Sequence, residues 1–360
     1  MGVSAGVFLT VVQIPMSKTS KDQTSQFNLA EDDVISDESP VIGTLEKNPV
    51  TVKPHTHPLM FRTTRRLFGV RFSHYNAKPG AAPKMTIPRL YEMYAAKQPI
   101  TCITAHDALS GRMADEAGID TVLVGDSLAM VAMGLESTSE IELEDMVYHC
   151  RAVARGAPRP FLIADLPFGS YEQSVEQACE SAIRMVKHGR AEAVKFEGGR
   201  ELCPIVERLS KFGIATVPHI GLTPQRQIST GGFKVQGKTA ASAKELLDDA
   251  LALEKAGATM ILLEGVPDRV ATVITERLNV PTIGIGAGSG TSGQVLVQID
   301  MLGGFDAFVP KFLKRYANIL ETHTSAIAKY HSEVKSGEFP SKQNSYSIKD
   351  AEFEKFTEML

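Results

Sequence analysis

The sequence predicts a closed (β/α)8 barrel, the TIM barrel fold, preceded by a disordered N-terminal extension. From residue 86 to about 340, apolar runs of strand length alternate with segments of helical periodicity. The runs are apolar on both faces, which is typical of parallel strands covered by helices. Eight such runs within about 240 residues favour a closed barrel, and an open doubly wound sheet is the alternative.

The expected strands can be read along the chain. They lie at 100–107, 120–127, 160–167, 191–199, 214–221, 259–267, 281–288 and 305–312. Between them, apolar residues recur at helical spacing, most clearly in 171–188. Gly118, Gly189 and Gly257 follow such segments, where a helix is expected to stop.

Three further segments flank or precede the barrel. Residues 1–59 are polar, rich in Ser and Thr, and without a sustained period, so we expect them to be disordered. Residues 60–85 contain four arginines and no acid, which is typical of a mitochondrial transit peptide. The alternative is a basic linker on a cytoplasmic protein. Residues 341–360 are expected to form a C-terminal tail.

Composition excludes several classes of protein. The net charge of -4 argues against a nucleic-acid binder, which usually carries a basic excess. No run of 18 apolar residues is present, so no membrane span is expected. The four cysteines contain no CxxC pair and are expected to be buried thiols, not a zinc site or disulfides. They are Cys102, Cys150, Cys179 and Cys203.

Acidic residues recur where the predicted strands end. They are Asp126, Asp165, Glu197 and Glu264. One such acid would more often cap a helix or lie in solvent, but the strand ends of a barrel share one mouth, so four acids should meet there. Clustered carboxylates repel one another and lose hydration, so they need a compensating cation. Oxygen ligands without Cys or His suit Mg²⁺.

Other polar residues lie at the same ends. Lys195 is two residues before Glu197, so both should point to one face, where the lysine can bind a substrate carboxylate or simply neutralise the acid. His219 ends the fifth run and can bind substrate, hold an acid or be an ordinary core residue. His106 and Asp107 end the first run, and Asp107 fits better as a helix N-cap.

The glycines after the seventh run need a separate interpretation. Residues 288–293 match GxGxxG, and Asp306 follows at a plausible distance. A dinucleotide fingerprint should follow the first strand of a βαβ unit, so the match is weak here. Close backbone approach to a ligand, or tight packing at the rim, explains the glycines better.

The chain resembles the ketopantoate hydroxymethyltransferase (3-methyl-2-oxobutanoate hydroxymethyltransferase) family from about Met85 to Pro340. The segments that carry the resemblance lie on nearly every strand and are together highly specific. They are TAHD, VGDSLAMVAMG, ADLPFGSY, AVKFEGG, PHIGLTPQ, GGFKVQGKT, LLEGVP and IGIGAG. The resemblance implies transfer of a hydroxymethyl group from 5,10-methylenetetrahydrofolate to 3-methyl-2-oxobutanoate, which gives ketopantoate for pantothenate and coenzyme A synthesis.

The resemblance also implies a metal site. Asp126 and Asp165 would be Mg²⁺ ligands that border the 2-oxo acid, and Glu197 would be a third ligand, directly or through water. The metal would stabilise an enolate of the substrate. The family forms large homo-oligomers, commonly decamers, so the expected partners are two small molecules and further copies of the chain.

The remaining roles follow in the same way. Ser127 and Lys195 would bind substrate, and Glu264 would accept the proton. His219 is expected to bind substrate from its place at the strand end, not from the resemblance. Two departures affect the folate pocket or oligomer contacts rather than the carboxylates. The glycine loop lacks the Asp that often precedes GQ, and Ile299 replaces a frequent His.

Two other readings stay open at this point. The first is a Mg²⁺-dependent enolate enzyme of the isocitrate lyase or phosphoenolpyruvate mutase type. Those enzymes typically use a reactive cysteine in a flexible loop, whereas Cys203 lies in an expected helix. The second is a non-catalytic barrel, which loss of Glu264 or an aspartate would favour, and none is lost.

Overall fold

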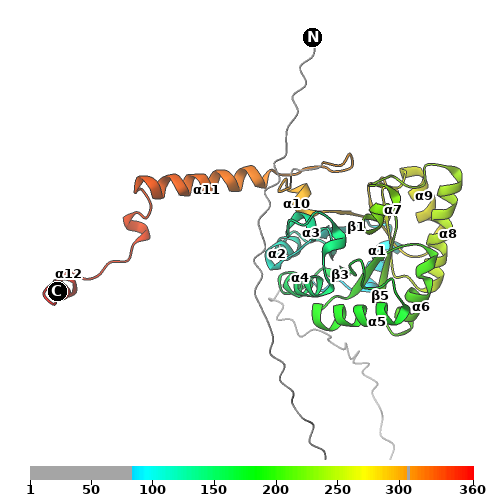
Figure 1. Cartoon of the computed structure of the whole chain (residues 1–360), viewed down its shortest axis with the longest axis horizontal. Coiled ribbons are helices and arrows are strands. Elements are labelled where there is room, and N and C mark those ends of the chain that lie inside the picture. The colour runs from blue at the N-terminus through cyan, green and yellow to red at the C-terminus, as the bar shows by residue number, and fades with distance from the viewer. Residues whose placement is uncertain (1–82, 306–308) are drawn as a thin grey trace, which may run out of the picture. The chain divides into compact units, whose positions relative to one another are not determined.

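A computed structural model describes residues 83–305 and 309–360, all within one compact unit. Eight parallel strands form a closed barrel in chain order, and β8 pairs with β1. Figure 1 labels β1, β3 and β5 among the helices of the barrel. The strands are β1 Ile100–Thr104, β2 Thr121–Val124, β3 Phe161–Asp165, β4 Ala193–Glu197, β5 Ala215–Gly221, β6 Ile261–Glu264, β7 Thr282–Ile285 and β8 Gly293–Leu296. The predicted barrel is confirmed. The predictions for residues 1–59 and for 60–82 lie outside the described residues.

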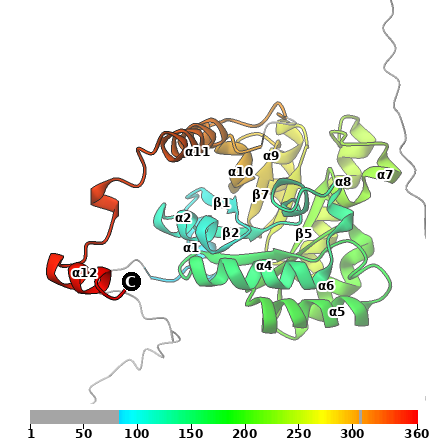
Figure 2. The same ribbon diagram turned by 60° about the vertical axis from the view of Figure 1, so that its left-hand side comes forward.

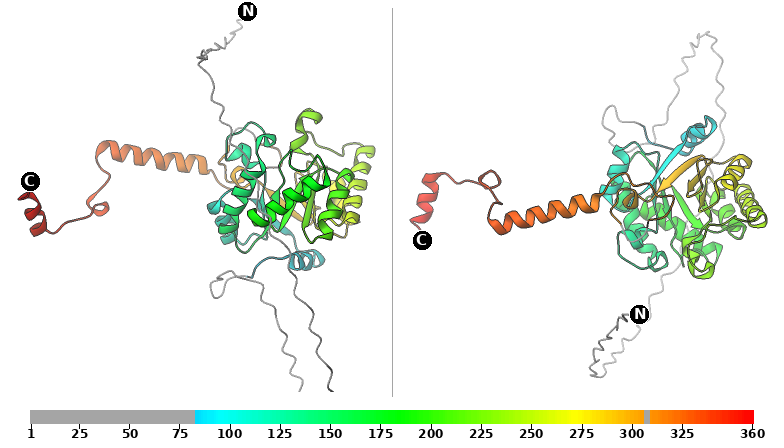
Figure 3. Two further views of the ribbon diagram at one scale, coloured as in Figure 1. Left: turned by 60° about the horizontal axis from the view of Figure 1, so that its bottom comes forward. Right: turned by 90° about the horizontal axis from the view of Figure 1, so that it is seen from above.

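Helices surround the strands, as Figure 2 and the two views of Figure 3 show. Neighbouring helices pack in chain order, with α5 against α6, α6 against α8 and α8 against α9. The helices are α1 Ile87–Ala95, α2 Ala108–Glu116, α3 Leu128–Val131, α4 Leu143–Gly156, α5 Val175–Arg184, α6 Cys203–Lys211, α7 Gln227–Thr230, α8 Ala240–Ala256, α9 Asp268–Arg277, α10 Gln298–Met301, α11 Ile319–Ser336 and α12 Asp350–Thr357.

The strands carry two hydrophobic faces because successive side chains point to opposite sides. Outward residues such as Val194 and Leu263 pack under the helices. Inward residues such as Ile163, Val217 and Leu262 form a separate core inside the barrel. Two residues further along each strand, the inward position reaches the mouth. Because every second residue of a strand points inward, the polar residues at the strand ends lie at the mouth, directly above the apolar side chains that fill the barrel.

The opposite end of the barrel is closed by α1, an element that the sequence did not predict. Leu90 of α1 is 1% exposed and belongs to the interior core. The hydroxyls of Tyr91 and Tyr94 donate to the carbonyls of Thr259 and Leu278, which anchors the helix to two loops. Leu90 therefore closes this end of the barrel with an apolar side chain.

The eighth strand differs from the prediction. The run 305–312 was expected to supply it, but β8 is Gly293–Leu296, inside the glycine-rich segment, and no helix separates it from β7. Gly293 lies against β1, where a Cβ would come within 2.3 Å of the carbonyl oxygen of Ile100. Gly293 therefore allows close strand packing, whereas Gly288 and Gly290 lie against Asp268 and Thr272 of α9. A strand of four residues that starts with glycine is too short to show an alternating apolar pattern in the sequence.

The predicted helix ends are largely confirmed. Asp107 is the N-cap of α2 and accepts from the Ser110 amide in a capping box. Gly118 and Gly257 adopt positive φ angles of 78° and 107° after α2 and α8, a conformation that glycine adopts without strain. Gly189 instead ends a π-helical turn, Met185–Gly189, and the left-handed residue is Arg190.

The segment after α10 is built differently from the barrel. Helix α11 contains no buried residue, and neither does α12, which lies in the expected C-terminal tail. The residues that precede α11 still contact the barrel, since residues 310–313 lie at its mouth, and the boundary at 340 stays a prediction. In the described ranges, none of the helices has the length and apolarity needed to span a membrane.

Replacement of Gly156 by alanine should destabilise the fold. Alanine normally stabilises a helix relative to glycine by about 1 kcal/mol. At Gly156, however, a Cβ would lie 2.0 Å from the carbonyl oxygen of Ala108, at the start of α2. Because backbone must move to relieve this clash, we expect a net loss of about 1–3 kcal/mol of unfolding free energy. Urea unfolding measures it, with the exposed neighbour Arg155→Ala as control. A midpoint equal to or above that of the wild type would contradict the packing.

Candidate active site

The mouth of the barrel holds all seven predicted site residues in one cavity. Its volume is about 940 Å³. The predicted residues that line it are Asp126, Ser127, Asp165, Lys195, Glu197, His219 and Glu264. Strand register explains the arrangement, because Asp165 lies opposite Lys195, and Glu197 lies opposite His219 on the next pair of strands.

Lys195 is buried among carboxylates. Its side chain is 5% exposed, and Nζ lies 2.8 Å from Oδ1 of Asp165. Burial opposes the charge on the ammonium group, but Asp165, Glu197 and Asp126 outweigh this and raise the pKa of Lys195. Lys195 is therefore positively charged. Its ion-pair partner is Asp165, and Glu197 is a second nearby carboxylate that favours the charge.

Asp126 lies next to this pair. Its backbone N–H donates to Oδ2 of Asp165 at 3.1 Å, which brings the ends of β2 and β3 together. Burial and the Asp165 carboxylate raise the pKa of Asp126 well above its usual range, although Lys195 acts in the opposite direction. An ionised Asp126 would therefore be strongly stabilised by a further positive charge in the mouth.

His219 lies between two acids. Its Nδ1 is 3.4 Å from Oε1 of Glu197, and its Nε2 is 3.4 Å from Oε2 of Glu264, distances longer than a good hydrogen bond. Burial disfavours the imidazolium, but the two carboxylates raise the pKa of His219 to about 9. Both ring nitrogens face protein acids, so this geometry favours the role of holding an acid in place over direct contact with substrate.

Glu264 differs from the other acids in its exposure. Its side chain is 19% exposed, against 1% for Glu197. Its backbone is held on both sides of β6, since the Glu264 carbonyl accepts from Leu222 N–H and Gly265 N–H donates to Ile285. A carboxylate on a rigid strand end, open to the cavity, is well placed to exchange a proton with a bound molecule.

The carboxylate oxygens at the mouth suit a hard divalent cation that also binds water or substrate oxygens. Across residues 83–305 and 309–360, no three His, Cys, Asp or Glu side chains form a ready-made metal site. Lys195 occupies Oδ1 of Asp165, and Glu197 is held from both sides. Mg²⁺ commonly binds through one or two carboxylates, with water and substrate completing six oxygens. The buried Asp126, with its raised pKa, and Asp165 fit that pattern.

Two residues to which the sequence analysis gave no role lie directly behind these acids. Gln225 is 6% exposed and donates from Nε2 to Oδ2 of Asp126 at 2.8 Å, and its backbone N–H donates to Oε2 of Glu197 at 2.9 Å. Tyr171 is 2% exposed and contacts both Gln225 and Glu197. The signal available was their position in the segments PHIGLTPQ and ADLPFGSY, just beyond strand ends.

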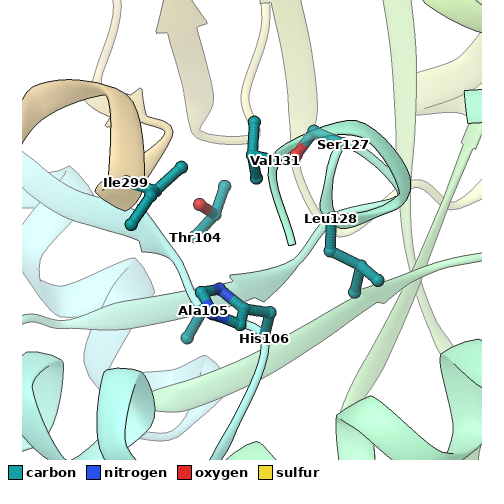
Figure 4. A pocket seen from close by; sticks show the side chains of 8 residues that line it. Thr104, Ala105, His106, Ser127, Leu128, Val131 and Ile299 are labelled. Atoms are coloured by element: carbon teal, nitrogen blue, oxygen red, sulfur yellow. The ribbon is translucent and has the colours of Figure 1, made fainter. Parts of the chain in front are cut away.

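A small pocket lies beside the main cavity at the start of α3. Figure 4 shows Thr104, Ser127, Val131 and Ile299 around it, with His106 close by. Ser127 lines both spaces. Burial lowers the pKa of His106, so this histidine is neutral at neutral pH. Ile299 is one of the two departures from the family pattern. It lines the same small pocket as Ser127, which is a candidate for substrate binding.

The cysteines are free thiols in the described residues, as predicted. Burial raises the pKa of Cys102 and of Cys150 to about 12. Cys203 is half-buried at the start of α6, and burial with nearby acids raises its pKa as well. A thiol of raised pKa is a poor nucleophile, which argues against the reading that needs a reactive cysteine.

Comparison with known proteins decides the family. Residues 84–342 match the family model described as ketopantoate hydroxymethyltransferase. The chain belongs to this family. It is therefore an enzyme, a hydroxymethyltransferase of the one-carbon class, and the non-catalytic reading is wrong. A 3-methyl-2-oxobutanoate hydroxymethyltransferase of Emericella nidulans is 53% identical over 282 residues, 78% of this chain and 81% of that protein.

Other ketopantoate hydroxymethyltransferases are nearly as similar. The 3-methyl-2-oxobutanoate hydroxymethyltransferase of Oleidesulfovibrio alaskensis is 50% identical, over 72% of this chain and 90% of that protein.

Among solved structures, 2,3-dimethylmalate lyase, a member of the PEP mutase/isocitrate lyase superfamily, is 14% identical with a TM-score of 0.47, over 76% of this chain and 94% of that one.

Proposed function

We propose that this chain transfers a hydroxymethyl group from 5,10-methylenetetrahydrofolate to 3-methyl-2-oxobutanoate and forms ketopantoate. The family assignment supports the two substrates. The observation that carries the proposal for this chain is the separation of roles in the mouth. Asp126 and Asp165 lie with Lys195 on one side, and the more exposed Glu264 lies beyond His219. The proposed metal ligands and the proposed base therefore occupy different parts of the mouth.

Substrate binding follows from charge. A 2-oxo acid brings a carboxylate into a mouth whose acids outnumber its cations, so it needs positive charge on entry. Lys195 supplies a fixed ammonium group there, and Ser127 supplies a hydroxyl at the start of α3. These two residues would orient the carboxylate and direct C3 of the acid away from Asp165 and towards the opposite wall.

Asp126 and Asp165 would hold Mg²⁺, with Glu197 next to them. When bound, the ion supplies Lewis-acid chemistry that acidifies the C3 proton and stabilises the resulting enolate. Asp126 is prepared for this, because the surrounding burial makes its ionised form depend on a nearby positive charge. Glu197 fits as an outer partner, since Gln225 and His219 already contact its two oxygens.

Glu264 would remove the C3 proton. Its carboxylate is accessible from the cavity, and Nε2 of His219 lies 3.4 Å from Oε2 on its buried side. Proton removal leaves electron density on C3, which would form a bond to the methylene carbon of the folate as one of that carbon's two C–N bonds breaks. Water would then replace the second C–N bond, which gives the hydroxymethyl group and releases tetrahydrofolate, whose two nitrogens take up the proton from C3 and one proton from water.

The folate would occupy the outer part of the cavity. A volume of about 940 Å³ lies at the upper end of the range for drug-sized ligands, so it exceeds the needs of a small 2-oxo acid. The cavity lining includes the apolar side chains of Leu222, Phe233 and Phe312, which follow the strand ends. Such walls suit the flat ring of a pterin.

Turnover tests the proposal. The purified full chain with 3-methyl-2-oxobutanoate, 5,10-methylenetetrahydrofolate and Mg²⁺ should form ketopantoate, measured by mass spectrometry. Addition of EDTA should abolish product formation, and excess Mg²⁺ should restore it. No product with both substrates and metal present would reject the reaction. Product formation unaffected by EDTA would reject the metal requirement alone.

We also propose that the chain forms a homo-oligomer, a decamer by family resemblance. Helix α11 has no buried residue, yet it exposes Leu320, Ile327, Tyr330 and Val334 along its length. A regular apolar set of this kind is typical of a surface that another chain covers. Light scattering on the purified chain measures the mass, and a monomer would contradict the proposal.

The location in the cell is a further part of the proposal. Arg62, Arg65, Arg66 and Arg71 precede the barrel without any acid before Glu92, which supports mitochondrial targeting. A reporter fused to residues 60–85 should reach mitochondria, and a cytosolic reporter would reduce the segment to a basic linker.

A further inference from the structure

Gln225 joins two of the candidate metal-side acids. Its Nε2 donates to Oδ2 of Asp126 at 2.8 Å and to the carbonyl of Leu166 at 3.1 Å. Its backbone N–H donates to Oε2 of Glu197 at 2.9 Å. One buried residue after β5 therefore fixes carboxylates at the ends of β2 and β4, which are 99 and 28 positions away in sequence.

Tyr171 determines which way the Gln225 amide points. The backbone N–H of Glu197 can only donate, so the Tyr171 hydroxyl accepts from it, at 3.1 Å. The single hydroxyl proton is then free to go to Oε1 of Gln225, at 2.5 Å. With Oε1 engaged, Nε2 must face Asp126, and both of its protons have acceptors. The amide is thus fixed by its surroundings and presents a donor to Asp126.

We propose that Tyr171 and Gln225 are a positioning pair that orients Asp126 and Glu197 towards a divalent cation. The inference rests on the proposed function, because it assumes that these acids serve a metal site. Neither residue touches substrate or cation in this account. Tyr171 acts on the carboxylate groups through Gln225, because its own contact with Glu197 is to the backbone N–H. Gln225 acts through its direct contacts with the two carboxylates. Outer partners of this kind typically change metal affinity 10–100-fold when they are removed.

Titration with Mn²⁺ alone, followed by electron paramagnetic resonance of the free ion, tests the pair on the full chain. Gln225→Leu removes the donor to Asp126 at similar size and should weaken Mn²⁺ binding about 10–100-fold. Tyr171→Phe removes one hydroxyl, frees the amide to flip and should weaken binding less. Because the tyrosine acts through the glutamine, the double variant should bind within about twofold of Gln225→Leu.

Val153→Ala controls for lost stability, since Val153 is fully buried in α4 and is part of the hydrophobic layer outside the strands. It should lower the unfolding midpoint without changing Mn²⁺ affinity.

If Gln225→Leu does not fold, the near-isosteric Tyr171→Phe carries the test. Wild-type affinity in Gln225→Leu or Tyr171→Phe would overturn the positioning pair alone, and additive losses in the double variant would overturn its serial arrangement. Absence of any Mn²⁺ site in the wild type would overturn both the pair and the metal part of the proposed function.

Discussion

Glu264→Gln should lower kcat roughly 100- to 10,000-fold, the range expected when a general base is lost. The substitution keeps the size of the side chain but removes its capacity to accept a proton and its negative charge beside His219. The Kd of 3-methyl-2-oxobutanoate, measured by calorimetry with Mg²⁺, should stay within a few-fold of wild type, because Asp126, Asp165 and Lys195 lie on the other side of the cavity.

The matched control is Glu276→Gln, an identical exchange at an exposed position of α9. It should leave kcat unchanged. A Glu264→Gln enzyme with near wild-type kcat would transfer the base role to another residue. If instead the Kd rose in parallel with the loss of kcat, the side chain would be a binding group and not a base.

Lys195→Met should have the largest effect on stability, and it should also abolish turnover. Removal of one partner of a buried ion pair typically costs about 3–5 kcal/mol, because the remaining charge is left without compensation. Here Asp165 loses its cation at 2.8 Å, and Asp126 loses the group that opposes its raised pKa. Urea unfolding of the metal-free protein measures the loss.

The stability deficit should depend on pH. Without Lys195, the pKa of Asp126 rises further above its value in the unfolded chain. A carboxyl group of raised pKa destabilises the folded state as pH increases through that interval, since ionisation is favoured only after unfolding. The variant should therefore be closer to wild type at pH 5 than at pH 8. The exposed Lys187→Met is the control, and an equal deficit at both pH values would contradict the buried-charge account.

Sequence patterns predicted seven strands and the residues that meet at the mouth. The reason is physical: inward positions repeat every second residue, and each β-α unit returns the chain to the same rim. The sequence analysis placed Lys195 and Glu197 on one face, but the ion pair between Lys195 and Asp165 depends on the register of β3 and β4. β8 could not be predicted, because it has only four residues and begins with Gly293, so it shows no clear alternation of apolar and polar residues. The longer apolar run at 305–312 resembles a strand more closely.

The outer partners of the acids were also beyond sequence reasoning. Gln225 lies in a loop without a period, and its contact with Asp126 depends on how that loop folds over the mouth. The same holds for His219, whose position between Glu197 and Glu264 follows from three-dimensional register across β4, β5 and β6. Patterns place side chains on faces, but they do not specify which atoms meet.

Deuterium exchange at C3 of 3-methyl-2-oxobutanoate, followed by proton NMR in D₂O without any folate, tests the central claim most directly. If the mouth acids hold a divalent cation that makes the C3 proton removable by Glu264, the wild-type chain with Mg²⁺ should exchange this proton. Exchange should cease on addition of EDTA. Exchange that continues unchanged without metal, or turnover to ketopantoate by a chain that shows no exchange, would contradict the account.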